Sequence, residues 1–142
     1  MKRRIFVKQL VLAASVAAIG FGSSSAFAQQ KTVKVGVLHS LSGTMAISET
    51  VLKDVALMAF DEINAKGGFG GKYKATLDIK DTRTDTAATV QAAQELVAAG
   101  VKVLITPCDA DPSIAAGQIS QPAMIPTFTF CGNTPTITGA VG

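Results

Sequence analysis

The feature of this chain that most limits its fold is a regular alternation of strand-like and helix-like segments between residues 33 and 130. Short β-branched or continuous apolar runs predict strands, and longer runs with apolar residues at three- and four-residue spacing predict helices. Strands and helices that alternate in this way form right-handed crossovers and a parallel sheet. We therefore expect an α/β fold, in which a parallel sheet has helices on both faces. The predicted strands are 33–38, 73–80, 101–106 and 125–130, and the predicted helices are 46–65, 87–99 and 111–121.

The first predicted helix has an apolar stripe that we expect to face the sheet. Its charged residues fall largely outside this stripe, as is typical of a helix with one buried face. The helix is expected to end at 64–68, because glycine there allows the left-handed conformation that closes a helix. The apolar residues of the stripe are Ile47, Val51, Leu52, Val55, Ala56, Met58, Ala59 and Ile63.

Residues 1–28 have the pattern of a cleavable export signal peptide. Four basic residues precede an apolar run over 10–21, which is shorter than the roughly 20 residues that span a bilayer. Small residues lead up to Ala28, and we expect cleavage after it. The pair Arg3-Arg4 is similar to a twin-arginine motif, so the twin-arginine route and the general export route both stay open. The sequence thus predicts a periplasmic protein with no membrane insertion after cleavage.

The basic character of the chain comes from this signal segment. The formal net charge is +3, but four of the thirteen Lys and Arg residues lie in 1–28, which leaves nine against ten Asp and Glu residues. A nearly neutral mature chain lacks the positive charge that nucleic-acid binding requires. We therefore expect no nucleic-acid partner.

The chain has two cysteines and one histidine, which limits the possible metal and redox chemistry. Cys108 and Cys131 lie at or just beyond the ends of the third and fourth predicted strands, which we expect to be neighbours. In an oxidising compartment such a pair favours a disulfide, and two buried free thiols are the alternative. With His39 as the single histidine, we expect no metal site and no cofactor.

Three polar loops follow predicted strands, at 39–44, 108–111 and 131–134. In parallel α/β sheets, ligands bind beyond the carboxyl ends of the strands, near the point where the strand order reverses. Two of these loops also enter helix N-termini, whose free N–H groups can bind ligand oxygens. The layout predicts a cleft for a small polar solute.

Two segments carry a resemblance to a known family. The run from Val35 to Ala46, with its His-Ser-Leu-Ser-Gly-Thr-Met loop, and the Asn-Ala-Lys-Gly-Gly-Phe-Gly-Gly stretch at 64–71 resemble the type 1 periplasmic solute-binding proteins of ABC transporters. That family includes binders of branched-chain amino acids, urea and short-chain amides. Its members are longer and have two lobes, so the resemblance implies that residues 29–142 are an incomplete N-terminal lobe.

The resemblance also implies which residues contact the solute. The family uses hydroxyl and backbone groups of the first loop, a serine after the third strand and a threonine after the fourth. In this chain Ala110 occupies the serine position and Asn133 the threonine position, and both are departures from the pattern. The expected ligand-contacting set is Ser40, Ser42, Gly43, Asp109, Ala110, Cys131 and Asn133.

Two aspartates surround the departure after the third strand. Asp111 precedes Pro112, so we expect its side chain mainly to cap the third helix, with ligand contact as the alternative. Asp109 is free of that role and is expected to face the cleft. An ionised carboxylate only accepts hydrogen bonds, so this pair would suit a donor-rich solute such as an amide, urea or an amine.

The sequence as a whole predicts the solute-binding component of an ABC importer, with a membrane permease as its partner. The alternative is a ligand-sensing domain of an amide- or amino-acid-responsive regulator or receptor. An enzyme is disfavoured, because neither a general base with an orienting group nor a cofactor motif is apparent.

Overall fold

The computed structural model describes residues 31–132 and 134–141. The predicted signal peptide at 1–28 and the predicted site residue Asn133 lie outside the described residues. The elements, in chain order, are β1 (Lys31–His39), α2 (Ala46–Ala65), β2 (Tyr73–Asp81), α3 (Thr86–Ala98), β3 (Val103–Ile105), α4 (Ala110–Ser120), β4 (Thr127–Phe128) and α5 (Thr136–Val141).

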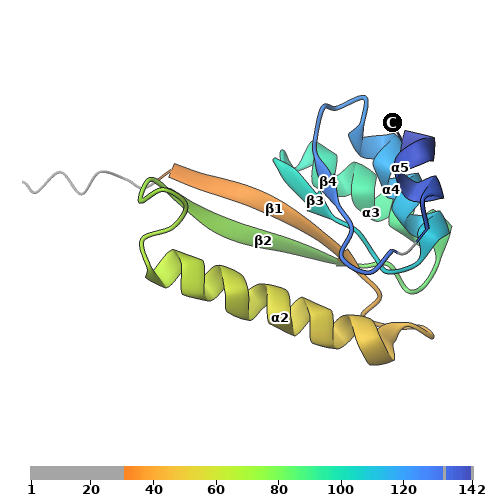
Figure 1. Ribbon diagram of the computed structural model, residues 1–142, viewed down its shortest axis with the longest axis horizontal. Coiled ribbons are helices and arrows are strands. Elements are labelled where there is room, and N and C mark those ends of the chain that lie inside the picture. Colours follow the sequence, from red (N-terminus) through yellow and green to blue (C-terminus); the bar gives the residue numbers. More distant parts are fainter. Residues whose placement is uncertain (1–30, 133, 142) are drawn as a thin grey trace, which may run out of the picture.

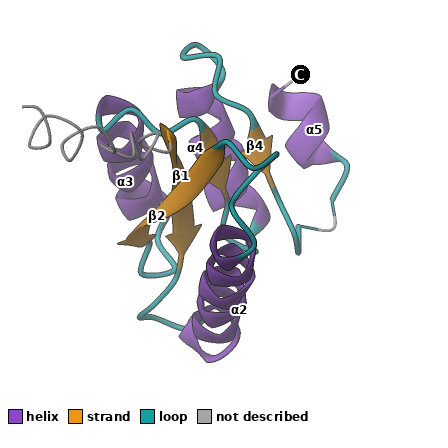
Figure 2. Cartoon of the chain, turned by 90° about the vertical axis from the view of Figure 1, so that its left-hand side faces the viewer, coloured by secondary structure: helices purple, strands orange, loops and turns teal. Residues whose placement is uncertain are grey.

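The four strands form one parallel sheet in the order β2-β1-β3-β4. Helix α2 lies against one face of the sheet, and α3 and α4 lie against the other (Figures 1 and 2). Each face has its own apolar core. Val35 and Val37 of β1 belong to the α2 side, whereas Leu38 packs with Leu96 and Leu104 on the α3 side, as the alternation of side chains along a strand requires. The predicted α/β architecture is confirmed.

The predicted elements agree with the structure best where the apolar pattern is long. Helix α2 has the predicted bounds, and α3 and β2 differ from prediction by one residue at each end at most. Strands β3 and β4 are shorter than predicted, and Pro126, which has no N–H to donate to a ladder, lies just before the start of β4. The short helix α5 was not predicted.

The buried stripe of α2 includes Ala56, as predicted, but differs from the predicted stripe elsewhere. Ile47 and Met58 are 88% and 66% exposed, whereas Glu49 and Ala56 are buried against the sheet. At 3.6 residues per turn, Ile47, Val51, Val55 and Met58 lie about half a turn from the line that Glu49 and Ala56 share. The helix has apolar residues on two opposite sides, and the sheet covers the side that contains Glu49.

The contacts of the segment after α2 show why it has the sequence Asn-Ala-Lys-Gly-Gly. The side chain of Asn64 donates to the carbonyl of Ala75 at 2.7 Å and accepts from its N–H at 2.9 Å, so it pairs with β2 as a further strand would. Gly67 and Gly68 have φ values of 98° and 79°. The N–H of Gly68 donates to the carbonyl of Ile63 at 2.8 Å and closes the helix. The motif thus fixes the turn from α2 into β2.

Candidate functional site

The candidate site lies at the carboxyl ends of β1 and β3. These neighbouring strands are the place where the strand order reverses, since β2 lies on one side of β1 and β3 on the other. The loop 40–45 leaves β1, and the loop 106–109 leaves β3. A third loop, after β4, is joined to the second by a disulfide. The structure therefore brings the three predicted loops to one edge of the sheet.

Ser40 holds the first loop to the loop that follows β2. Its side chain is buried, and its hydroxyl lies 2.9 Å from Thr82 Oγ1 and accepts from the N–H of Thr84 at 3.0 Å. These contacts satisfy the hydroxyl within the protein. Ser40, which the sequence predicts as a solute contact, thus has a structural role in the described chain.

Asp81 organises the exposed part of the same loop. It accepts from Ser42 Oγ at 2.7 Å and from the N–H groups of Leu41 and Arg83 at 2.9 Å. Desolvation opposes ionisation of Asp81, but the hydrogen bonds from Ser42, Arg83 and Leu41 outweigh it and lower the pKa of the carboxyl. The sequence prediction missed Asp81, although its place at the end of a strand was a usable signal.

Gly43 allows the first loop to pass close to the loop after β2. Its φ is 85°, and a Cβ at this position would lie 2.6 Å from the carbonyl oxygen of Arg83. The next residues stay in contact, since Thr84 Oγ1 accepts from the N–H of Met45 at 3.0 Å. Gly43 thus has a steric reason to be glycine that holds whether or not it contacts a solute.

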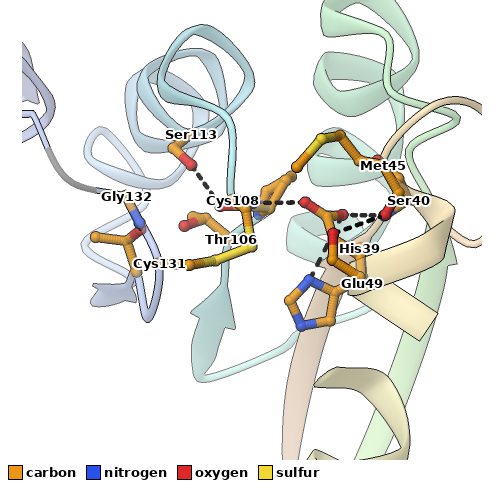
Figure 3. Close-up of a disulfide and its surroundings, with 12 residues drawn as sticks. His39, Ser40, Met45, Glu49, Thr106, Cys108, Ser113, Cys131 and Gly132 are labelled. Carbon is orange, nitrogen blue, oxygen red and sulfur yellow. Dashed lines mark hydrogen bonds and ion pairs between the residues drawn. A yellow bond between two sulfur atoms is a disulfide. The ribbon is translucent and has the colours of Figure 1, made fainter. Parts of the chain in front are cut away.

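Cys108 and Cys131 are joined by a disulfide, with a Cα–Cα distance of 4.9 Å (Figure 3). This is the pairing that the sequence predicts, and it follows from the neighbouring positions of β3 and β4. The bond ties the loop after β3 to the loop after β4. Cys131 therefore lies beside the second loop of the candidate site.

Asp109 and Ala110 line a hollow of about 330 Å³ at the start of α4, together with Thr84, Thr86, Asp111 and Pro112. The predicted capping role of Asp111 is wrong. The N-cap of α4 is Asp109, and Asp111 lies within the first turn and is exposed. The side chain of Asp109 makes no capping hydrogen bond, so the helix terminus does not use this carboxylate.

Glu49 of α2 is a fully buried carboxylate that the sequence prediction missed. One oxygen, Oε1, accepts from the N–H of Cys108 at 2.7 Å, and the other, Oε2, accepts from the N–H of Ser40. Nδ1 of the buried His39 lies 3.8 Å from Oε2 (Figure 3). Glu49 falls on the same side of α2 as Ala56 and Phe60, but the opposite side is also apolar, so helical phase alone gave no signal for its burial.

His39 is buried beside this carboxylate, and neither ring nitrogen has a hydrogen-bond partner among the described residues. Burial lowers the pKa of His39 below its ordinary 6.5, and the opposing effect of Glu49 is smaller. The unfolded chain therefore binds this proton more readily than the folded chain. As the pH falls through about 6.5, we expect the free energy of unfolding to decrease, by at most about 1.4 kcal/mol per pH unit for one proton.

Denaturant unfolding of the wild type and of His39→Gln between about pH 8 and pH 5 tests this expectation. The variant has no imidazole to protonate, so its stability should change less over this range. Equal slopes for the two proteins would contradict the assignment to His39.

Two further observations concern the described residues alone. No three side chains among His, Cys, Asp and Glu lie close enough there to hold a metal ion. None of the helices in the described part of the chain is both long enough and apolar enough to cross a membrane.

Comparison with known proteins places the fold in a family context. A model of the family described as "Periplasmic binding protein" matches residues 32–140. Leu/Ile/Val-binding protein homolog 8 of Brucella suis is 30% identical over 133 residues, which is 94% of this chain and 32% of the relative. The chain therefore spans about a third of the length of this relative.

Solved structures give the same picture. The branched-chain amino acid transporter substrate-binding protein LivJ from Streptococcus pneumoniae, in complex with isoleucine, matches with a TM-score of 0.73 and 29% identity over 77% of this chain and 31% of that chain. A solute-binding protein of an ABC transporter from Rhodopseudomonas palustris, in complex with 3,4-dihydroxybenzoic acid, has a TM-score of 0.67 and 25% identity, covering 77% of this chain and 30% of that chain. All three similar proteins are named for binding, not for catalysis.

Proposed function

This chain belongs to the periplasmic binding protein family, and we propose on that premise that it is the extracytoplasmic solute-binding component of an ABC importer. It would capture a small polar solute and deliver it to the membrane permease. The observation that carries the proposal is the meeting of the loops after β1, β3 and β4 at the switch point of a parallel sheet, where ligands bind in such folds.

The solute that we propose is of the amino-acid, urea or amide type. The similar proteins are named for leucine, isoleucine and valine or were solved with isoleucine, which supports an amino-acid-like class. The aromatic acid bound by the Rhodopseudomonas protein shows that proteins of this fold also take other solutes. Asp109 favours a solute with N–H groups, because its carboxylate accepts hydrogen bonds and no helix cap uses it.

The proposed contacts are the set that the sequence predicts. Asp109 and Ala110 line the hollow at the start of α4, and Ser42 and Gly43 are exposed on the first loop. Ser40 would act through its position rather than through its hydroxyl, which Thr82 and Thr84 occupy. Cys131 and Asn133 would complete the set from the loop after β4.

The place of action that we propose is the periplasm, and residues 1–28 would be the signal that directs export. The family description supports this location. The disulfide between Cys108 and Cys131 also supports it, since such bonds persist in oxidising compartments.

Binding of a small amide, urea or an amino acid tests the proposal directly. We expect one such compound, at a hundredfold excess over its dissociation constant, to stabilise the full-length protein by about 2.7 kcal/mol. Thermal unfolding against a panel of L-isoleucine, L-leucine, acetamide, urea and sugars is the measurement. A melting temperature that only sugars raise would contradict the solute class.

Asp109→Asn should weaken binding of the compound that this panel identifies. Loss of a charged acceptor costs about 1.5–3 kcal/mol, which is roughly a ten- to hundredfold rise in the dissociation constant. Asp61→Asn, at an exposed position on α2, is the matched control and should leave affinity unchanged. Equal affinities in titration calorimetry would return Asp109 to a structural role.

A further inference from the structure

We propose that Glu49 is a positioning residue, which sets the relative placement of the loops after β1 and β3 and so shapes the solute site. The inference that a solute site is shaped rests on the proposed function. The inference that Glu49 positions the loops rests on its own hydrogen bonds. Glu49 lies on α2, outside all three loops, and acts through the backbone of two of them (Figure 3).

The two hydrogen bonds of Glu49 come from residues near the start of each loop. Ser40 is the first residue after β1, and Cys108 lies just beyond β3. Each donates its backbone N–H to a different oxygen of the same carboxylate. A carboxylate is rigid and planar, so two donors on its two oxygens have a fixed separation. One side chain therefore links the two loops beyond the last paired residues of β1 and β3.

The link continues to the third loop through a covalent bond. Cys108, whose N–H binds Glu49, is joined through its sulfur to Cys131. A connected path thus runs from Ser40 through Glu49 and Cys108 to Cys131, and it crosses the carboxyl ends of β1, β3 and β4. Ser40 extends the path to the loop after β2 through Thr82 and Thr84.

Because Glu49 is buried, its carboxyl group depends on both backbone N–H donors. A carboxyl oxygen removed from water loses its hydration, which is unfavourable unless hydrogen bonds from the protein replace it. Here the backbone donors of Ser40 and Cys108 do so, and Nδ1 of His39 lies 3.8 Å from Oε2. Movement of either loop away from the site would leave a buried oxygen without a donor, which opposes that movement.

Two variants of the full-length protein separate positioning from simple stabilisation. Glu49→Gln keeps the shape but has one acceptor oxygen, and its NH₂ group would face the second N–H. Glu49→Asp keeps the carboxyl group but is one methylene shorter, so it cannot hold both donors in the same places. Glu62→Gln, on the exposed side of α2 in an ion pair with Lys66, is the control.

Three measurements are made well below the melting temperature of each variant. The first is the dissociation constant for whichever probe of the panel binds the wild type. The second is amide hydrogen exchange at Ser40 and Cys108, and the third is the rate at which dithiothreitol reduces the disulfide. In Glu49→Gln and Glu49→Asp we expect at least tenfold weaker binding, at least tenfold faster exchange at one or both amides, and faster reduction, with Glu62→Gln unchanged.

Each outcome has a defined meaning. Wild-type affinity in a Glu49 variant with altered amide exchange would overturn the positioning role, because the loops would have moved without effect on the site. Unaltered exchange and reduction would overturn the link itself. When no probe binds the wild type, the proposed solute class fails, and the link is decided by exchange and reduction alone. When one Glu49 variant does not fold, the other decides.

Discussion

Replacement of both Cys108 and Cys131 by serine is expected to lower the free energy of unfolding by roughly 3 kcal/mol. The disulfide closes a loop with a sequence separation of 23, and the chain-entropy model assigns about this stabilisation to a loop of that size. A small domain with a free energy of unfolding of about 5–15 kcal/mol would lose a large part of its stability. Denaturant unfolding of the full-length oxidised protein and of the double variant measures the difference.

Two controls separate the effect of losing the disulfide from the effect of the serine side chains. The wild type reduced with a non-thiol reductant should unfold at the same denaturant concentration as the double variant, since both lack the cross-link. Thiol titration of the denatured protein, purified without reductant, should find no free thiol. Two reactive thiols per chain, or equal stability of the oxidised and reduced protein, would contradict the prediction.

Gly68→Ala is expected to destabilise the protein by about 2–5 kcal/mol. An alanine at φ 79° costs about 1–2 kcal/mol by itself. Its Cβ would also lie 2.1 Å from the carbonyl oxygen of Tyr73, so the start of β2 would have to shift to make room. Such overpacking adds about 1–3 kcal/mol. Thermal or denaturant unfolding measures the sum.

Gly67→Ala is the matched control for this prediction. The adjacent glycine has a φ of 98°, but a Cβ there would meet no atom within 4 Å. It should therefore show the cost of the left-handed conformation without the collision. Equal destabilisation by the two substitutions would mean that the close approach of Tyr73 to Gly68 does not contribute to the free energy lost.

The sequence predicted the fold well because long periodic segments determine it. The segment 46–65 became α2 with the same bounds, since twenty residues of helical periodicity and a glycine stop leave few alternatives. The ends of β3 and β4 were less predictable, because a short apolar run such as 125–130 does not show which of its residues pair with a neighbouring strand. The side of α2 that faces the sheet was also undetermined, since both sides carry apolar residues.

The sequence predicted where the candidate site lies, but not which contacts its residues make. The alternation of strands and helices indicated which loops meet, and Cys108 and Cys131 followed from neighbouring strands. The partners of the hydroxyls could not be read from spacing, because Ser40 and Thr84 lie far apart in the chain and meet only in the fold. Glu49 was hidden for a similar reason: a glutamate on a helix is usually exposed, and only its two distant backbone donors explain its burial.

The position of β1 has a consequence for how the newly made chain folds. β1 is the first strand of the described chain and pairs on both sides, with Tyr73 of β2 opposite Lys31 and Val103 of β3 opposite Val35. During synthesis this apolar strand has neither neighbour until β2 and then β3 have been made. Because such long-range pairings close large loops before they gain contacts, they form slowly. The strand order that brings the loops after β1 and β3 together therefore also delays completion of the sheet until β3 has been made.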